Sequence, residues 1–287
     1  MNKVVEVKNL CKNYDDFALE DVSFDIPKGY ITGFIGPNGS GKTTTIKSIL
    51  NIIRYDSGNV KIFGEDNSNR ASPINEQIGV VMDSPPFADD WTISDVEAAV
   101  SPFYQYWDSR MFGGLLKKYN ISKKKKVKEL SRGMKVKLAI AVALSHGAHL
   151  LILDEPTSGL DPVARDELCD MLRDFVSDEN KSVLFSTHIT ADLEKTADYI
   201  TFILGGRIVF SGTKDELFDK YVLVKGGLQD VSPEQKKLII GIREYGTGFE
   251  GMADSGNIDR LPRDLLFEPI TIDEIIVFFF KGANVNE

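Results

Sequence analysis

The sequence predicts an α/β fold in which parallel strands alternate with helices. Short apolar segments have the length and composition of buried strands at 31–35, 78–82, 150–153 and 183–186. Helical stretches at 42–52 and 163–177 follow two of these strands, which is typical of a parallel sheet. A glycine-rich loop, 36–41, joins the first strand to its helix. Together these observations predict one α/β core.

The segments around this core predict two additions to it. Near the N-terminus, Val4, Val5 and Val7 indicate an opening strand, and 22–26 alternates apolar and polar residues like a half-buried strand. A turn at 27–29 leads into the core. Residues 84–147 contain many aromatic side chains and almost no strand pattern, so we expect a helical insertion there.

The end of the chain predicts a small appendage. Segments 200–204 and 207–210 favour a hairpin. Beyond them, residues 213–287 carry 9 basic and 14 acidic residues, a net charge of 9 − 14 = −5, and many glycines. We expect a domain over 1–220 and an α+β appendage over 221–287. Thr271 and Glu274 fit a capping box, which favours a helix over a strand for the final apolar segment.

Composition excludes several classes of protein. The net charge of −9 disfavours a general nucleic-acid binder, because such a protein needs cationic surface to neutralise phosphates. No apolar run approaches the roughly 20 residues of a membrane-spanning helix, and residues 1–10 lack a signal-peptide core. Cys11 and Cys169 form no CxxC pair and predict reduced, structural cysteines. We therefore expect a cytosolic chain without a membrane span.

The glycine-rich loop predicts a phosphate site. It matches G-x-x-x-x-G-K-[ST] with Gly36, Pro37, Asn38, Gly39, Ser40, Gly41, Lys42 and Thr43. Glycines let backbone N–H groups turn inward around an anion, and the following helix presents unpaired donors to phosphate. In this motif the lysine reaches the β- and γ-phosphates and the Thr43 hydroxyl ligates Mg²⁺. Thr44, the next residue, is a further candidate for nucleotide binding.

Two carboxylates follow the apolar strand 150–153. Asp154 and Glu155 lie where the carboxyl end of a parallel strand meets bound phosphate. Asp154 suits a role at Mg²⁺, and Glu155 is placed to polarise an attacking water. The Asn-Lys-x-Asp motif that reads guanine is missing from the sequence, and small kinases lack the Asp-Glu ending. The pattern favours an ATPase with a water-activating glutamate.

At this point the sequence resembles the ATP-binding subunit of an ABC transporter over about residues 3–220. The run 151–162, Leu-Ile-Leu-Asp-Glu-Pro-Thr-Ser-Gly-Leu-Asp-Pro, carries much of this resemblance. Gly36–Thr43 stands at the position of the Walker A loop, and Ser158–Asp161 at that of the D-loop. The resemblance implies that Tyr14 stacks on adenine, that Glu155 is the catalytic base, and that His188 contacts the γ-phosphate. Residues 130–134 stand at the family signature, which implies that Ser131 and Gly133 contact the γ-phosphate held by the other subunit.

The resemblance also implies an architecture and partners. The fold would be a P-loop NTPase (RecA-like) core with an antiparallel β-subdomain, a helical subdomain at about 84–147, and the C-terminal appendage. Two ATPase subunits, as a homodimer or heterodimer, would clamp two ATP with Mg²⁺. They would dock on an integral membrane permease at the cytoplasmic face of the cell membrane. Export of drugs, antibiotics or peptides fits best. Import remains open, as does a soluble ABC ATPase on ribosomes or chromosomes, although no nucleic-acid partner is expected.

Three residues depart from the family pattern. Asp83 stands where a glutamine is expected; it can ligate Mg²⁺ as a hard oxygen donor, but it also adds negative charge beside a triphosphate. Arg132 replaces a glycine of the signature, and Met134 replaces its glutamine. We expect slower or more tightly gated hydrolysis, with the site still active.

Two weaker patterns have alternative interpretations. Residues 117–137 hold ten basic residues against one acidic residue, either as a solvated face or as a contact for an acidic segment, lipid headgroups or phosphates. The aromatic residues from 87 to 112 form either a core or a groove for the membrane partner, in which case Phe87 and Trp91 are the best anchors. His146 and His149 lack co-ligands spaced for a metal site.

Overall fold

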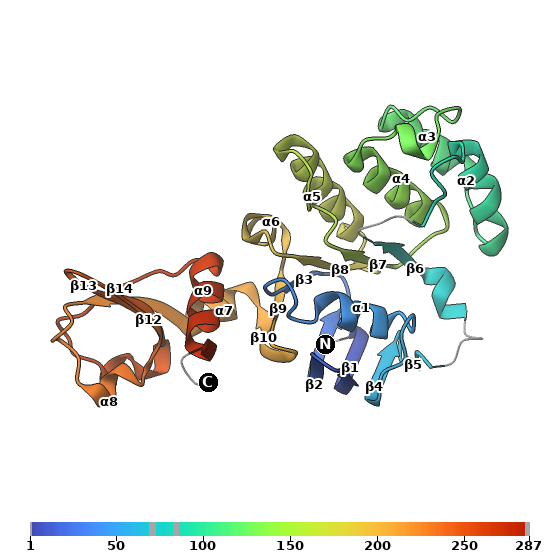
Figure 1. Ribbon diagram of the computed structural model, residues 1–287. Coiled ribbons are helices and arrows are strands. Elements are labelled where there is room, and N and C mark those ends of the chain that lie inside the picture. The colour runs from blue at the N-terminus through green and yellow to red at the C-terminus, as the bar shows by residue number, and fades with distance from the viewer. Residues whose placement is uncertain (1, 69–72, 83–85, 285–287) are drawn as a thin grey trace. The chain divides into compact units, whose positions relative to one another are not determined.

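The computed structural model describes residues 2–68, 73–82 and 86–284 (Figure 1). The chain divides into two compact units, Met1–Ser211 and Gly212–Glu287. Helix α7 (Lys214–Lys220) packs against strand β11 (Tyr221–Gly226) of the second unit. That unit therefore begins before the boundary that we expected at residue 220. No helix in the described part of the chain is long and apolar enough to span a bilayer.

A six-stranded sheet forms the centre of the first unit. Its order is β10-β9-β3-β8-β7-β6, and the strands are β3 (Ile31–Ile35), β6 (Ile78–Val81), β7 (Leu150–Asp154), β8 (Ser182–Thr187), β9 (Tyr199–Leu204) and β10 (Arg207–Thr213). Strands β9, β3, β8, β7 and β6 are parallel. All residues of β3, β7 and β8 are buried, which explains their apolar composition. The predicted α/β fold with a parallel core is confirmed.

A second, antiparallel sheet lies beside helix α1 (Lys42–Ile49). Its order is β2-β1-β4-β5, and the strands are β1 (Lys3–Asn13), β2 (Ala18–Pro27), β4 (Ser57–Ile62) and β5 (Glu65–Asp66). Ile46 and Ile49 of α1 join one apolar core with residues of both sheets. The helix is shorter than the expected 42–52 because the chain turns at Asn51, whose φ is +52°.

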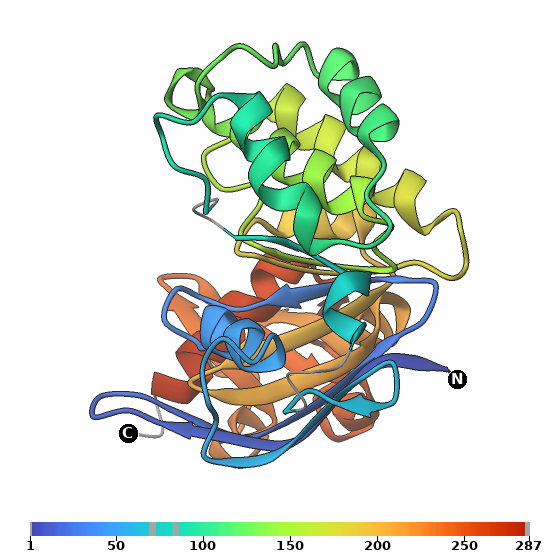
Figure 2. The ribbon, with the colours of Figure 1, turned by 90° about the vertical axis from the view of Figure 1, so that its right-hand side faces the viewer.

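Helices cover the other face of the parallel sheet. Helices α2 (Ile93–Val100), α3 (Ser109–Lys118), α4 (Arg132–Ser145) and α5 (Pro162–Val176) lie on that side, opposite α1 (Figures 1 and 2). Short 3₁₀ turns, Pro73–Gln77, Ser101–Phe103 and Val127–Glu129, and helix α6 (Thr190–Thr196) complete this unit. The described part of 84–147 is thus helical, as the sequence predicted.

The aromatic residues of this helical region divide between core and surface. Phe112 is fully buried, and Phe87 and Trp107 pack partly against the same core. Trp91 is 40% exposed and Phe103 is 78% exposed. Core packing therefore accounts for Phe112 and in part for Phe87 and Trp107, while Trp91 and Phe103 are exposed.

The second unit is a small α+β fold. Its antiparallel sheet has the order β12-β13-β11-β14, with β12 (Ile239–Tyr245), β13 (Gly248–Asp254) and β14 (Leu266–Glu268). Helix α9 (Ile272–Asn284) packs on β12 and β13, and the short elements α8 (Pro233–Lys236) and Ser255–Arg260 lie between strands in the sequence. The Thr271 amide donates to Glu274 Oε2 at 2.8 Å, and the Glu274 amide donates to Thr271 Oγ1 at 3.3 Å. The predicted capping box and final helix are confirmed.

Candidate functional site

The glycine-rich loop wraps around the start of α1. Gly39 and Gly41 have φ values of +80° and +110°, a region that favours glycine. A Cβ at Gly36 would lie 2.3 Å from the carbonyl oxygen of Ile203 and 2.5 Å from Ser40 Oγ, so the loop is too closely packed for a side chain there. Ser40 Oγ is buried and has no hydrogen-bond partner among the described residues. The loop therefore offers a cradle of backbone groups that fits a phosphate.

Lys42 holds a nearly buried ammonium at this loop. Its side chain is 6% exposed. The Nζ atom donates to the carbonyl oxygens of Gly36 at 2.7 Å and Pro37 at 3.2 Å, and it lies 3.2 Å from Glu155 Oε1. The Lys42 ammonium therefore contacts both the glycine-rich loop and the carboxylate of Glu155.

Asp154 is tied to both neighbouring elements. The Thr43 hydroxyl donates to Asp154 Oδ2 at 2.8 Å, and the Ser186 hydroxyl donates to Asp154 Oδ1 at 2.7 Å. Asp154 is 2% exposed. A hydroxyl and a carboxylate in contact are the hard oxygen donors that suit Mg²⁺. The family resemblance marks only His188 in this part of the chain, so the sequence does not identify Ser186 as a site residue.

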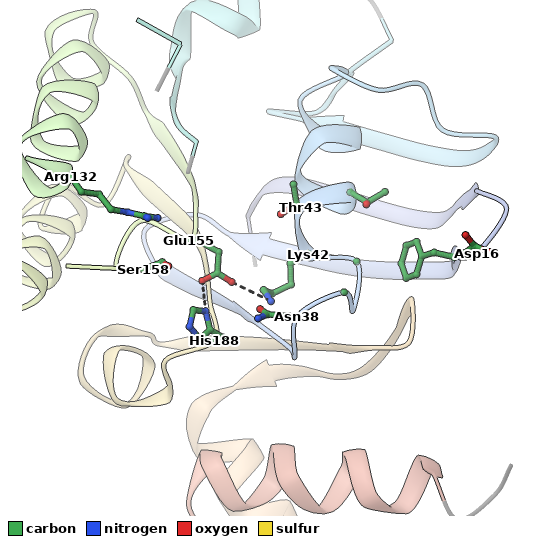
Figure 3. Close-up of a pocket in the computed structure, with 12 residues that line it drawn as sticks. Asp16, Asn38, Lys42, Thr43, Arg132, Glu155, Ser158 and His188 are labelled. Carbon is green, nitrogen blue, oxygen red and sulfur yellow. Dashed lines mark hydrogen bonds and ion pairs between the residues drawn. The ribbon is translucent and has the colours of Figure 1, made fainter. Parts of the chain in front are cut away.

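Glu155 turns sharply out of strand β7. Its φ of +50° is unusual for a residue with a side chain, and its amide donates to Ser186 Oγ at 2.9 Å. The carboxylate joins Lys42 through Oε1 and His188 Nδ1 through Oε2, the latter at 2.7 Å (Figure 3). The turn thus places a carboxylate between a cation and an imidazole.

Lys42, Thr43, Glu155 and His188 line one pocket of about 640 Å³ (Figure 3). The predicted residues Gly36, Pro37, Ser40 and Asp154 are not among the described residues that line it. Eight predicted site residues line it: Asn38, Gly39, Gly41, Lys42, Thr43, Thr44, Glu155 and His188. Four lining residues were not predicted: Asp16, Phe17, Arg132 and Ser158. Asp16 and Phe17 follow Tyr14 in a turn, where no motif marks them. Arg132 lies in the signature and Ser158 in the D-loop, but the family resemblance assigns binding roles in these motifs only to Ser131 and Gly133.

Some predicted residues lie away from this lining. Tyr14 is 49% exposed, and Lys12 Nζ lies 5.4 Å from the centre of its ring. Ser131 caps α4 by accepting a hydrogen bond from the amide of Met134 at 3.3 Å. Neither Tyr14 nor Ser131 nor Gly133 is among the described residues that line the pocket. Asp83 lies outside the described residues.

His146, which precedes β7, is held by contacts within the fold. His146 Nδ1 lies 3.0 Å from the carbonyl oxygen of Glu76, and its ring stacks on Tyr104 with centroids 4.0 Å apart. Burial lowers the pKa of His146 below its ordinary value. Among the described residues, no cluster of three or more His, Cys, Asp or Glu side chains could hold a metal ion.

Five of the ten basic residues in segment 117–137 form ion pairs with acidic residues from elsewhere in the chain. The ion pairs join Lys135 to Asp89, Lys126 and Lys128 to Asp90, Lys123 to Glu97, and Lys137 to Glu167. These partners favour a solvated, ion-paired face.

The comparisons with known proteins decide the family. A family model described as ABC transporter matches residues 19–158. The lantibiotic transport ATP-binding protein SrtF of Streptococcus pyogenes is 34% identical over 229 residues, which cover 77% of this chain and 98% of SrtF. The chain belongs to the ABC transporter ATP-binding family. The bacitracin transport ATP-binding protein BcrA of Bacillus licheniformis is 31% identical over 212 residues, covering 73% of this chain and 69% of BcrA.

Solved structures agree with this assignment. An ATP-binding subunit of an ABC transporter superposes with a TM-score of 0.66 at 28% identity, covering 75% of this chain and 91% of the other. The cbiO1 protein of Clostridium perfringens, part of the ABC transporter complex cbiONQ, gives 0.65 at 26% identity, covering 76% and 91%. The predicted P-loop NTPase fold is confirmed. This chain is an ATPase subunit of an ABC transporter.

Proposed function

We propose that this ABC ATPase hydrolyses ATP in a dimer and drives export through a separate integral membrane permease. The subunit would bind at the cytoplasmic face of the membrane. SrtF and BcrA, named for lantibiotic and bacitracin transport, support a peptide or antibiotic as cargo. Nod factor export ATP-binding protein I of Burkholderia orbicola, 32% identical over 224 residues, supports the export direction. All three names favour transport over action on ribosomes or chromosomes.

The nucleotide would bind with its phosphates in the loop 36–41. Backbone amides of the glycines and of the first turn of α1, with Thr44, would donate to phosphate oxygens. Lys42 would exchange carbonyl and carboxylate partners for phosphate oxygens. Tyr14, whose side chain is 49% exposed, would stack on adenine.

Thr43 and Asp154 would hold Mg²⁺ in this site, with Asp83 as a further candidate ligand. When bound, the ion would neutralise charge on the phosphate oxygens. Asp154 is kept in place by Ser186, whose hydroxyl donates to it at 2.7 Å. The protein thus supplies hard oxygen donors in a fixed orientation.

Glu155 and His188 would carry the chemical step. Glu155 would accept the proton of the attacking water, because its carboxylate faces the phosphate pocket. His188 would orient that carboxylate through Nδ1 and contact the γ-phosphate through its other ring nitrogen. The contact of one carboxylate with both Lys42 and His188 is the observation on which this proposal depends.

Ser131 and Gly133 would act on the nucleotide of the second subunit. They lie at the start of α4, a helix of 14 residues, and line no part of the described pocket of their own subunit. A helix N-terminus binds anions through its unpaired amides. Two such subunits would therefore complete each other's sites around two ATP.

The test is the variant Glu155→Gln with Mg²⁺ and ATP. We expect a stable dimer with bound ATP and almost no hydrolysis, measured by sedimentation and phosphate release. Glu20→Gln is the matched control, because Glu20 pairs with Arg207 on the surface, and it should turn over normally. Normal turnover by a monomeric Glu155→Gln protein would refute the mechanism.

A further inference from the structure

The turn that joins β1 to β2 brings two residues into the pocket of Figure 3 that no motif marks. Asp16 and Phe17 line this pocket together with Thr43 and Thr44 at the start of α1. The amide of Tyr14 donates to the carbonyl oxygen of Phe17 at 2.8 Å, which closes the hairpin between the two strands. The tip of this hairpin therefore borders the residues that would bind phosphates.

Phe17 holds the hairpin against the glycine-rich loop. A Cβ built at Gly41 would lie 2.9 Å from Cζ of Phe17, so the ring packs directly on this loop. The ring is also partly buried against the apolar core that α1 shares with both sheets. Because Phe17 is anchored in this way, its neighbour Asp16 has a defined place on the pocket wall.

The carboxylate of Asp16 has no partner within the described part of the chain. The residue is exposed and forms no hydrogen bond or ion pair with another described residue. Lys12, the nearest lysine in the sequence, instead pairs with Asp56 at 3.0 Å. An ionised carboxylate can only accept hydrogen bonds, and phosphate oxygens would repel it. In a nucleotide pocket it therefore suits a part of the ligand that donates.

The place of Asp16 along the pocket indicates which part that is. Figure 3 shows Lys42 between Asp16 and Glu155, so Asp16 lies at the end away from the carboxylate that would activate water. Tyr14, two residues before Asp16, would stack on the base. The sugar joins the base to the first phosphate, so it would lie level with Asp16. Its two hydroxyl groups are hydrogen-bond donors, and acidic side chains bind ribose hydroxyls in dinucleotide-binding folds.

We propose that Asp16 accepts hydrogen bonds from the ribose hydroxyls of the bound nucleotide and so favours ribonucleotides over deoxyribonucleotides. The proposal rests on the proposed function, because it requires a nucleotide in this pocket. It adds a contact to the sugar, whereas the roles proposed above concern the base, the phosphates and Mg²⁺.

The experiment compares the affinities of the full chain for ADP, 2′-deoxy-ADP and 3′-deoxy-ADP, each with Mg²⁺, by calorimetry. These probes differ only in the sugar. The wild-type chain should bind at least one deoxy nucleotide about tenfold more weakly than ADP, the size of one lost hydrogen bond to a charged group. Asp16→Ala should bind all three within about twofold. Asp16→Asn should fall between, because its amide oxygen still accepts.

Asp15→Ala is the matched control. Asp15 is an exposed aspartate in the same turn, but it is not among the described residues that line the pocket. The variant should discriminate between ADP and its deoxy forms as the wild type does. Melting curves of the variants verify that each is folded.

Three results overturn the proposal while the proposed function stands, provided that Lys42→Ala abolishes ADP binding. The first is equal binding of ADP and both deoxy nucleotides by the wild-type chain. The second is discrimination that survives Asp16→Ala. The third is a changed preference for ADP over GDP with an unchanged preference for ribose, which would assign Asp16 to the base. If the wild-type chain bound no ADP, the proposed function and this inference would both fail.

Discussion

Ser186 offers a sharp test of how the carboxylates are held. Its hydroxyl donates to Asp154 Oδ1 at 2.7 Å and accepts the amide of Glu155 at 2.9 Å, and the residue is fully buried. Ser186→Ala removes both hydrogen bonds and leaves the buried Asp154 Oδ1 and the part-buried amide of Glu155 without this partner. Each costs about 1–3 kcal/mol, so we expect about 2–6 kcal/mol less stability in total.

Ser186→Ala should lower the ATPase activity more than the loss of a side chain that only packs in the core would. Groups that orient metal ligands or catalytic residues typically change affinity or activity by about 10–100-fold, and we expect a loss of that size in the ATPase rate. The apparent Mg²⁺ requirement should also rise, because Asp154 would keep only its contact with Thr43. Steady-state phosphate release at saturating ATP, with Mg²⁺ varied, measures both effects.

Ser182→Ala is the matched control on the same strand, β8. Ser182 is also fully buried, and its hydroxyl accepts one hydrogen bond, from the amide of Gly29 at 2.9 Å. Its loss should cost about 1–3 kcal/mol and leave turnover of the folded protein unchanged. Equal ATPase rates and Mg²⁺ requirements for the two variants would refute the role given to Ser186.

Three further predictions concern other parts of the chain. Burial lowers the pKa of His146 below its ordinary value of 6.5. As the pH falls, His146 is therefore protonated in the unfolded chain at a higher pH than in the folded chain, and the stability should decrease below about pH 6.5. Thermal melts from pH 7.5 to 5 should show this loss in the wild type and a smaller one in His146→Gln. Gly41→Ala should abolish nucleotide binding in calorimetry, because the new Cβ would lie 2.6 and 2.9 Å from neighbouring side chains. Gly147→Ala is the control: that residue also has a positive φ, +77°, but has open space around it, so the variant should bind nucleotide normally. Phe278→Ala in α9 should cost the second unit about 3–5 kcal/mol in urea unfolding, and Phe280→Ala, 48% exposed, less than about 1 kcal/mol; equal losses would contradict the packing of α9.

The sequence predicts those parts of the fold that depend on local pattern. The apolar runs predict the buried strands β3, β7 and β8, and the motif 36–43 predicts the loop and the start of α1. The end of α1 was predicted three residues too far, because apolar residues at 50, 52 and 53 continue the helical pattern. The left-handed turn at Asn51 overrides that pattern, and asparagine tolerates such a turn.

Charge patterns were the least informative part of the sequence. The basic segment 117–137 has one acidic residue of its own, yet five of its lysines form ion pairs with carboxylates in the folded chain. Their partners come from 89–97 and from α5, which are distant in sequence. No local count can include partners that only the fold brings near.

The register of the parallel sheet explains why the phosphate loop, Glu155 and His188 meet. Asp154 of β7 pairs with Ser186 of β8, and Thr187 of β8 pairs with Ile35 of β3, so three strands end at the same level. The phosphate loop, Glu155 and His188 each follow one of these ends. A shift of one residue between β7 and β8 would turn the side chains of β7 to the opposite face and separate Asp154 from Ser186. The motifs predict which residues act, but the strand register, which the motifs do not encode, places their carboxylate, ammonium and imidazole within one pocket.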